Sequence, residues 1–420
     1  MTHINVVRPT SDHNTQMANW TELPPEILVS IANRFVGDDP FDVTRFRSVC
    51  RSWRFSVPRR KSSPDLPLRL PVWFSPRQNA PPPGHFKLTR RTIYAVEQVM
   101  VNNQVPCPKW LLKLQEITPG KMRLSPLLAS YQICHPPEMF PRILDLSNLR
   151  VSTISRGYDL NYMPERGVSL SFCGDYYSLQ AERVAISAKS GEDFAIMAIH
   201  SGGNLAFMKA RDERWTDVDG QTTRYDDIIY HDDKFYAVDW MGKTFTIDSR
   251  FEFHPHELAQ VPGEGSKKHL VESKSTDDLL MVDKYMDDVS GEDFTTKTVQ
   301  LKVYRLKKEL QRWEEVENLG DESLFLGDDC SFSVMAEDLP GLKSNCIFFK
   351  DRRFSRYNYN PDSLRQVLSD DIGVFTLDDK CIRPLTAYIE ICLLFWPPST
   401  MGLKLCFQNQ QPCEFSRVEL

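Results

Sequence analysis

The stretch Tyr225-Asp-Asp-Ile-Ile-Tyr-His-Asp-Asp-Lys-Phe-Tyr-Ala-Val-Asp239 predicts two short β-strands joined by a tight turn. Its aromatic and β-branched residues favour strands, and Asp232-Asp233 between the two apolar runs is typical of a turn. A third β run, Thr244–Asp248, follows after Gly242. The segment therefore predicts neighbouring strands that are connected by short turns.

Short β runs of the same kind occur along most of the chain, separated by turn signals at a spacing of about ten residues. Further examples are Phe194–His200, Leu205–Lys209, Leu279–Tyr285, Val299–Leu306, Phe332–Met335, Cys346–Phe349 and Gly373–Leu377. Long helical patterns are few. Such a series over roughly 300 residues predicts an all-β solenoid, sandwich or propeller.

An internal repeat favours the propeller. Trp215-Thr-Asp-Val218 and Trp313-Glu-Glu-Val316 each precede a pair of β runs, and their tryptophans lie 98 positions apart. That distance is twice a blade repeat of about 40–50 residues. At this period residues 87–400 would hold six or seven blades, and the segment 401–420 could complete the last one. We therefore expect a large all-β domain, a six- or seven-bladed β-propeller.

Residues 18–57 have a different pattern, because their apolar residues recur at helical spacing. The two stripes are Leu23, Ile27, Leu28, Ile31 and Phe35, and Phe46, Val49, Cys50 and Trp53. Pro24-Pro25 suits the first turn of a helix, where missing amide donors cost nothing. We expect two or three small helices after a flexible N-terminus at residues 1–17. An all-α unit of this size buries little apolar surface, so it needs a partner.

The segment 58–86 predicts an extended linker, because its eight prolines suppress both helices and central strands. It is also basic. Between Val57 and Arg91 the chain has eight Lys or Arg residues and one acid, whereas the net charge of the whole chain is −6. Arg59-Arg60-Lys61 could act as a nuclear import signal or contact nucleic acid, but a solvated linker is favoured. Val72-Trp73-Phe74 is an apolar exception, predicted to be an edge strand or an anchor onto the next domain.

The composition predicts a folded, soluble protein. Of its 420 residues, 41% are apolar and 26% charged, close to the averages of globular domains. The ten cysteines are scattered without close pairs, which predicts reduced thiols in an intracellular protein. The first twenty residues are polar, and the most apolar run, Ile389–Trp396, is too short for a membrane helix. We expect a protein of the nucleus or cytoplasm, without membrane contact and with nucleic acid disfavoured as a partner.

Residues Trp20–Val57 resemble an F-box. The motifs that carry the resemblance are Leu23-Pro24, the stripe Ile27, Leu28 and Ile31, and Val49-Cys50-Arg51-Ser52-Trp53-Arg54, which mirrors the family's V-C-K/R-x-W ending. The stretch 37–42 is slightly longer than the family's connector and is interpreted as a loop insertion. The remainder resembles the plant F-box proteins whose C-terminal half is a KIB-type, kelch-like propeller. This second resemblance is carried by residues 225–248, 301–306, 324–334, 338–349 and Trp396-Pro397-Pro398.

The resemblance implies a multidomain protein, with a small all-α F-box unit at 18–57, a linker at 58–86 and a propeller at 87–400. It also implies a substrate receptor of a Skp–cullin–F-box (SCF) ubiquitin ligase. The F-box would bind the Skp adaptor, and through it the cullin and RING subunits, while the propeller would hold an unidentified target protein. The adaptor-binding residues that it implies are Leu23, Pro24, Ile27, Leu28, Ile31, Phe35, Val49, Cys50, Trp53 and Arg54. No catalytic residue is implied, because ubiquitin transfer would take place in partner subunits.

Other motifs are weaker. Gly242-Lys243-Thr244 lacks the first glycine of a phosphate-binding P-loop and is interpreted as a hairpin turn. The segment Gly263–Lys268 is interpreted as a flexible basic loop. His254-Pro-His256 and Cys134-His135 have no second pair at zinc spacing, so we expect no metal and no cofactor. The acid pairs are interpreted as turn residues; they are 226–227, 232–233, 277–278, 287–288, 328–329, 370–371 and 378–379.

Two alternatives remain open at this stage. The chain could be a propeller enzyme or small-molecule-binding module with an F-box-like cap, which convergent acids, histidines or a metal at the central opening would indicate. It could also be an F-box scaffold that binds the adaptor without promoting degradation.

Overall fold

The structure, a computed structural model, divides the chain into two compact units, residues 1–60 and 61–420. The described residues are 20, 23–35, 42–57, 66–73, 83–98, 109–118, 121–129, 149–165, 179–187, 194–200, 202–218, 223–248, 256–288, 296–351, 372–388, 391 and 393–395. The expected flexible N-terminus (1–17), the basic triplet 59–61 and the C-terminal segment 401–420 lie outside them.

The first unit contains three helices, as the apolar spacing predicts. They are α1 (Pro25–Phe35), α2 (Asp42–Ser48) and α3 (Arg51–Ser56). The carbonyl of Pro24 accepts hydrogen bonds from the amides of Ile27 and Leu28, both at 3.1 Å, at the start of α1. None of the helices in the described ranges is long and apolar enough to cross a membrane.

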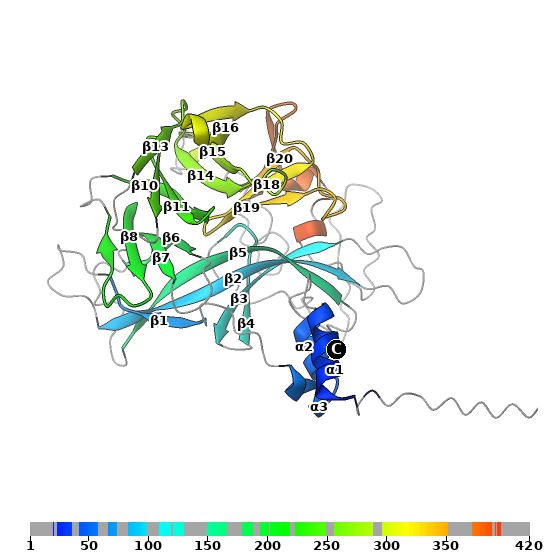
Figure 1. The fold of residues 1–420 in the computed structure, drawn as a ribbon. Coiled ribbons are helices and arrows are strands. Elements are labelled where there is room, and N and C mark those ends of the chain that lie inside the picture. The colour runs from blue at the N-terminus through cyan, green and yellow to red at the C-terminus, as the bar shows by residue number, and fades with distance from the viewer. Residues whose placement is uncertain are drawn as a thin grey trace, which may run out of the picture. The chain divides into compact units, whose positions relative to one another are not determined.

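The second unit is a β-propeller of five sheets (Figure 1). The first sheet contains β1 (Leu68–Leu70), β2 (Gly84–Gln98), β3 (Trp110–Thr118), β4 (Lys121–Ser125) and β5 (Leu149–Pro164). The second contains β6 (Ala181–Ile186), β7 (Ala195–His200), β8 (Asn204–Lys209) and β9 (Thr216–Asp217). The third contains β10 (Tyr225–His231), β11 (Lys234–Asp239), β12 (Lys243–Asp248) and β13 (His256–Gln260).

The fourth sheet contains β14 (Lys267–Glu272), β15 (Leu279–Asp288), β16 (Thr296–Lys307) and β17 (Arg312–Val316). The fifth contains β18 (Glu322–Leu326), β19 (Ser331–Met335), β20 (Cys346–Lys350), β21 (Ile372–Thr376) and β22 (Cys381–Pro384). Short 3-10 turns are η4 (Lys308–Leu310), η6 (Leu385–Ala387) and η7 (Leu393–Phe395). The strand pairs are antiparallel except β18–β20, which is parallel.

The expectation of six or seven blades is wrong, because five sheets account for the strands among the described residues. The repeat itself is correct: Trp215 precedes the last strand of the second sheet and Trp313 lies on the last strand of the fourth, two blades apart. The expected number of blades was too high because the sheets at the two ends of the ring contain more residues than a regular repeat. The first sheet occupies residues 68–164, where β2 and β5 are 15 and 16 residues long, and the fifth has five strands.

The middle strands of the propeller are buried on both faces. All six residues of β7 are buried. Ile196 and Ala198 pack in a cluster with the first sheet, whereas Met197 and Ile199 pack in a cluster with the third. Because successive strand residues point to opposite faces, one apolar run can fill two interfaces between blades. Five such clusters separate the five pairs of neighbouring sheets.

The ring closes between the first and fifth sheets. Ile93 and Leu111 pack there against Phe325 and Phe348. Asp329 is buried in the same seam and lies 2.8 Å from the Arg91 guanidinium and 2.5 Å from the Lys113 ammonium. Although burial alone would raise the pKa of Asp329, Lys113 and Arg91 hold it below its ordinary value. Asp159 lies 2.7 Å from Arg91, so two cations and two carboxylates compensate one another where the two ends of the propeller meet.

The segment expected to be a linker contributes to the propeller. Within 58–86, Leu68–Leu70 form β1, which pairs with β2. Trp73 is 3% exposed, and its ring stacks on His200 at 4.4 Å between centroids. Val72-Trp73-Phe74, predicted to be an edge strand or an anchor, therefore contains an anchor residue of the first two sheets; Phe74 lies outside the described residues.

Replacing Asp329 by Asn should destabilise the propeller by about 3–5 kcal/mol, because the buried Lys113 loses its counter-charge and Arg91 keeps only that of Asp159, 2.7 Å away. In the wild type, Asp329 should stabilise the folded state above the ordinary carboxyl pKa of 3.8. This stabilisation should be lost as the pH falls below that value, because the pKa of Asp329 is lower in the folded state than in the unfolded state. Urea unfolding at pH 7 and pH 3, followed by tryptophan fluorescence, measures both effects.

Asp328→Asn is the matched control. Asp328 pairs with Lys350 at 3.1 Å on the surface, so its loss should cost at most about 1 kcal/mol. Equal destabilisation by the two substitutions would contradict the role of Asp329 in ring closure.

Candidate functional site

The three helices of the first unit enclose a very small core. Leu28, Ala32 and Phe46 are buried, and Leu23, Ile31, Trp53 and Val57 pack against them. The rings of Phe46 and Trp53 lie 4.4 Å apart between centroids, and Trp53 Nε1 donates to the carbonyl of Trp20 at 2.9 Å. Arg47 donates to the carbonyls of Arg54 and Val57, at the end of α3. The helices are thus held by one apolar cluster and a few hydrogen bonds.

The ten residues implied in adaptor binding fall into two groups. Leu28 is fully buried, and Leu23, Ile31, Cys50 and Trp53 are partly buried. Pro24, Ile27, Val49 and Arg54 are exposed, and the side chain of Phe35 lies outside the described residues. The residues of the first group support the fold of the unit, while those of the second are available to a partner.

Large apolar side chains are exposed on the first unit. The exposed fractions are 61% for Trp20, 48% for Ile27, 39% for Val29, 56% for Val49 and 84% for Phe55. Single exposed apolar residues are ordinary, but five within so short a segment are typical of a protein interface. Trp20, Val29 and Phe55 were absent from the residues implied by sequence: Val29 lies between the positions of the first stripe, and Trp20 and Phe55 lie outside the two stripes.

The innermost strands of the propeller enclose a central channel. A cavity of about 440 Å³ is lined by β5, β6, β10, β14 and β19, one strand from each sheet, and by adjoining residues. Its charged lining residues include Arg156, Arg183, Asp227, Glu272 and Asp329. The channel is therefore a polar space at the centre of an apolar ring.

Arg183 connects three inner strands across this channel. Its guanidinium lies 3.1 Å from Asp227 on β10 and donates to His269 Nδ1 on β14 at 3.1 Å. Burial raises the pKa of Asp227, an effect that Arg183 and the amides of Leu270 and Ile228 oppose. Burial and the positive charge of Arg183 together hold the pKa of His269 well below its ordinary value, so the imidazole is neutral.

The acid pair Asp226-Asp227 has a different role from the turn that the sequence indicates. Both residues lie within β10, and the strand register shifts between Tyr225 and Asp227. Because a bulge interrupts the alternation of side chains, both carboxylates reach the same neighbouring strand. Asp226 accepts from the amide of Lys268 and Asp227 from that of Leu270, both at 2.9 Å. The pair therefore joins the third and fourth blades.

Several other motif interpretations are tested by the structure. Asp232 and Asp233, with φ of 47° and 61°, form the predicted turn between β10 and β11. Gly242 has a φ of 80° in the turn between β11 and β12, as expected for a hairpin. The expectation of a flexible basic loop at Gly263–Lys268 is wrong for its two lysines, because both lie in β14 and Lys268 is 1% exposed, 3.5 Å from the buried Asp283.

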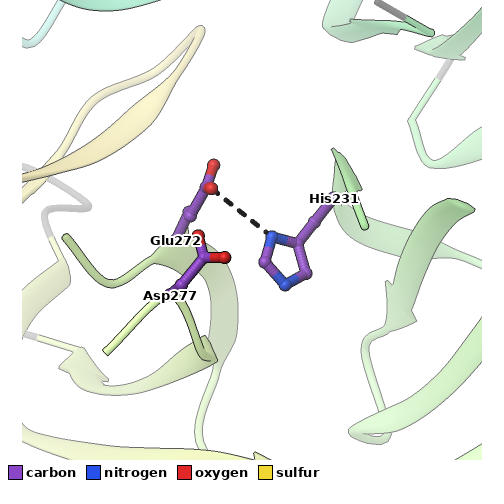
Figure 2. A group of neighbouring side chains, drawn as sticks. All are labelled: His231, Glu272 and Asp277. Carbon is purple, nitrogen blue, oxygen red and sulfur yellow. Dashed lines mark ion pairs between the residues drawn. The ribbon is translucent and has the colours of Figure 1, made fainter. Parts of the chain in front are cut away.

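One histidine and two acids meet beside the channel (Figure 2). His231 ends β10, Glu272 ends β14, and Asp277 lies in the turn before β15. His231 Nδ1 is 3.6 Å from a carboxylate oxygen of Glu272, and the interaction with His231 lowers the pKa of Glu272. One ligand atom of each residue lies within 4.8 Å of the other two. These residue types are the ones that bind divalent cations.

The sequence reasoning did not identify this cluster. His254, Cys134 and His135, which it considered instead, lie outside the described residues, and His256 is exposed on β13. The internal repeat could have revealed it. His231 and Glu272 end consecutive inner strands, so they are separated in sequence by one blade period of roughly 40 residues.

Comparison with known proteins gives a family model that matches residues 85–376, described as the KIB1-4 beta-propeller. An Arabidopsis thaliana protein whose name describes it as an F-box protein, At5g60060, is 39% identical over 372 residues, covering 86% of this chain and 94% of the relative. F-box protein SKIP23 from the same plant is 30% identical over 408 residues, covering 91% of this chain and 95% of the relative.

Solved structures match less well. A chain of a nidogen/laminin complex aligns with 70% of this chain and 91% of its own length, at 10% sequence identity and a TM-score of 0.31. A similarity of this size carries no argument about function.

Leu28→Ala should unfold the first unit or destabilise it by about 2–5 kcal/mol, because the cavity would lie in a core of three buried side chains. Ile27→Ala, one position away on the exposed surface, should change stability by less than about 0.5 kcal/mol. Amide hydrogen exchange over residues 25–56 measures both. Similar protection in the two variants would contradict the assignment of Leu28 to the core and Ile27 to the surface.

Proposed function

The chain belongs to the plant F-box proteins with a KIB1-4 β-propeller, and on this basis we propose that it is a substrate receptor of an SCF ubiquitin ligase. The F-box unit would bind the Skp adaptor, which connects it to the cullin and RING subunits. The propeller would hold the protein to be ubiquitinated. The observation that supports this division most directly is the exposed apolar surface of the helical unit.

Adaptor binding would complete a hydrophobic core that the first unit lacks by itself. Ile27 and Val49 are about half exposed, although Ile27 precedes the buried Leu28 and the amide of Val49 donates to the carbonyl of the buried Phe46 at 3.3 Å. Covering such side chains contributes roughly 25 cal/mol per Å² of apolar area. Arg54 is also exposed and would lie at the polar rim of the interface, where a charge contributes little affinity.

Target binding is proposed for the propeller, because its ring provides a rigid support for turns that can vary without loss of the core. Trp240 and Met241, 57% and 50% exposed, form one such turn, between β11 and β12. We assign no residue to the target. We propose no catalytic role for this chain, because the receptor supplies binding and the partner subunits supply ubiquitin transfer. A site of action in the nucleus or cytoplasm follows from the proposal.

Ile27→Ala combined with Val49→Ala should weaken binding of the purified full-length protein to a purified Skp adaptor at least tenfold. Each substitution removes apolar surface from the proposed interface, and tenfold corresponds to about 1.4 kcal/mol. Isothermal titration calorimetry measures the affinity, and circular dichroism shows whether the helices remain folded.

Met241→Ala is the control, because Met241 is as exposed as Ile27 but lies on the propeller. It should bind the adaptor with wild-type affinity. If the double variant remains folded and binds as tightly as the wild type, the adaptor does not use this surface.

A further inference from the structure

The cluster of His231, Glu272 and Asp277 at the edge of the channel has the geometry of a partly preformed cation site (Figure 2). In a tetrahedral zinc site with bonds of about 2.1 Å, neighbouring ligand atoms lie about 3.4 Å apart. His231 Nδ1 and the nearest Glu272 oxygen are 3.6 Å apart. These two atoms therefore need to move little to share one ion.

Burial distinguishes this cluster from an ordinary group of surface acids. His231 is 5% exposed and its ring is directed towards the carboxylates, whereas the Glu272 side chain is 51% exposed and Asp277 is also exposed. The imidazole thus provides a fixed donor on β10, and the acids provide adjustable donors on the next blade. An imidazole with two carboxylates suits zinc better than calcium or magnesium, which prefer oxygen ligands alone.

Lys308 lies on the far side of the histidine. Its ammonium is 3.4 Å from His231 Nε2 and 2.9 Å from Asp232. A lysine that donates to Nε2 leaves the Nδ1 proton directed at Glu272, and an ion at Nδ1 would have to replace that proton. Because it is also a positive charge close to the cluster, Lys308 opposes the binding of a cation.

We propose that His231, Glu272 and Asp277 bind one zinc ion at the seam between the third and fourth blades, and that Lys308 lowers its affinity. Three protein ligands leave a fourth position for water or for a donor atom of a bound molecule. Glu272 and Asp277 both line the channel, so that position is close to it. This inference does not depend on the proposed receptor function.

The test is zinc binding to the full-length protein by equilibrium dialysis. The wild type should bind one equivalent of zinc that is absent from the His231→Gln variant. The Asp277→Asn variant should bind the same ion at least tenfold more weakly than the wild type. Asp277 is exposed and has a φ of 59°, which Asn tolerates, so the second variant keeps its fold. Lys308→Met should bind about tenfold more tightly than the wild type.

His256→Gln is the matched control, because it removes an exposed imidazole outside the cluster and should leave zinc binding unchanged. Cobalt(II) as a probe should give the visible bands of a four-coordinate site without a sulfur charge-transfer band, which separates this site from binding by cysteines. Wild-type zinc binding by both His231→Gln and Asp277→Asn would overturn the site. A Lys308→Met variant with unchanged or weaker affinity would overturn the role of Lys308.

Discussion

Every sheet of this propeller is apolar on both faces, so each must be covered by another sheet on both sides, and only a closed ring meets that requirement. In β7, neighbouring residues Met197 and Ala198 belong to different clusters, one on each side of the strand. The ring closes where the first and last sheets join. There the apolar contacts of Ile93 and Phe348 are accompanied by the buried charges of Arg91, Lys113 and Asp329.

The helical unit is under the opposite constraint, since it has too few residues to cover its own apolar surface. Among the described residues, its core consists of Leu28, Ala32 and Phe46 with partly buried neighbours. Ile27 and Phe55 remain in contact with water. A family of proteins that keeps this unit must therefore supply another surface for it, which is the physical basis for proposing an adaptor partner. The propeller buries its own core and leaves its turns and channel available for a second partner.

Local structure was largely predictable from the sequence. The runs at 225–248 are strands, Asp232-Asp233 is a turn, and helices occur where the apolar residues recur at helical spacing. The blade count was not predictable, because the long pair β2–β5 consumes residues that a regular repeat would assign to a further blade. Asp226-Asp227 was misread for a similar reason: a bulge in β10 directs both carboxylates towards β14. The contact between His231 and Glu272 depends on how consecutive blades pack, which cannot be predicted from a single sequence.

The central claim is that one chain joins an adaptor to a target, and it can be tested in plant cells with the proteasome inhibited. Proteins that co-purify with the wild type would be compared with those that co-purify with the Ile27→Ala, Val49→Ala variant. The account predicts that the variant loses the adaptor and cullin while the same target proteins accumulate on it without ubiquitin. Recovery of adaptor, cullin and ubiquitinated targets in equal amounts with both proteins would contradict it.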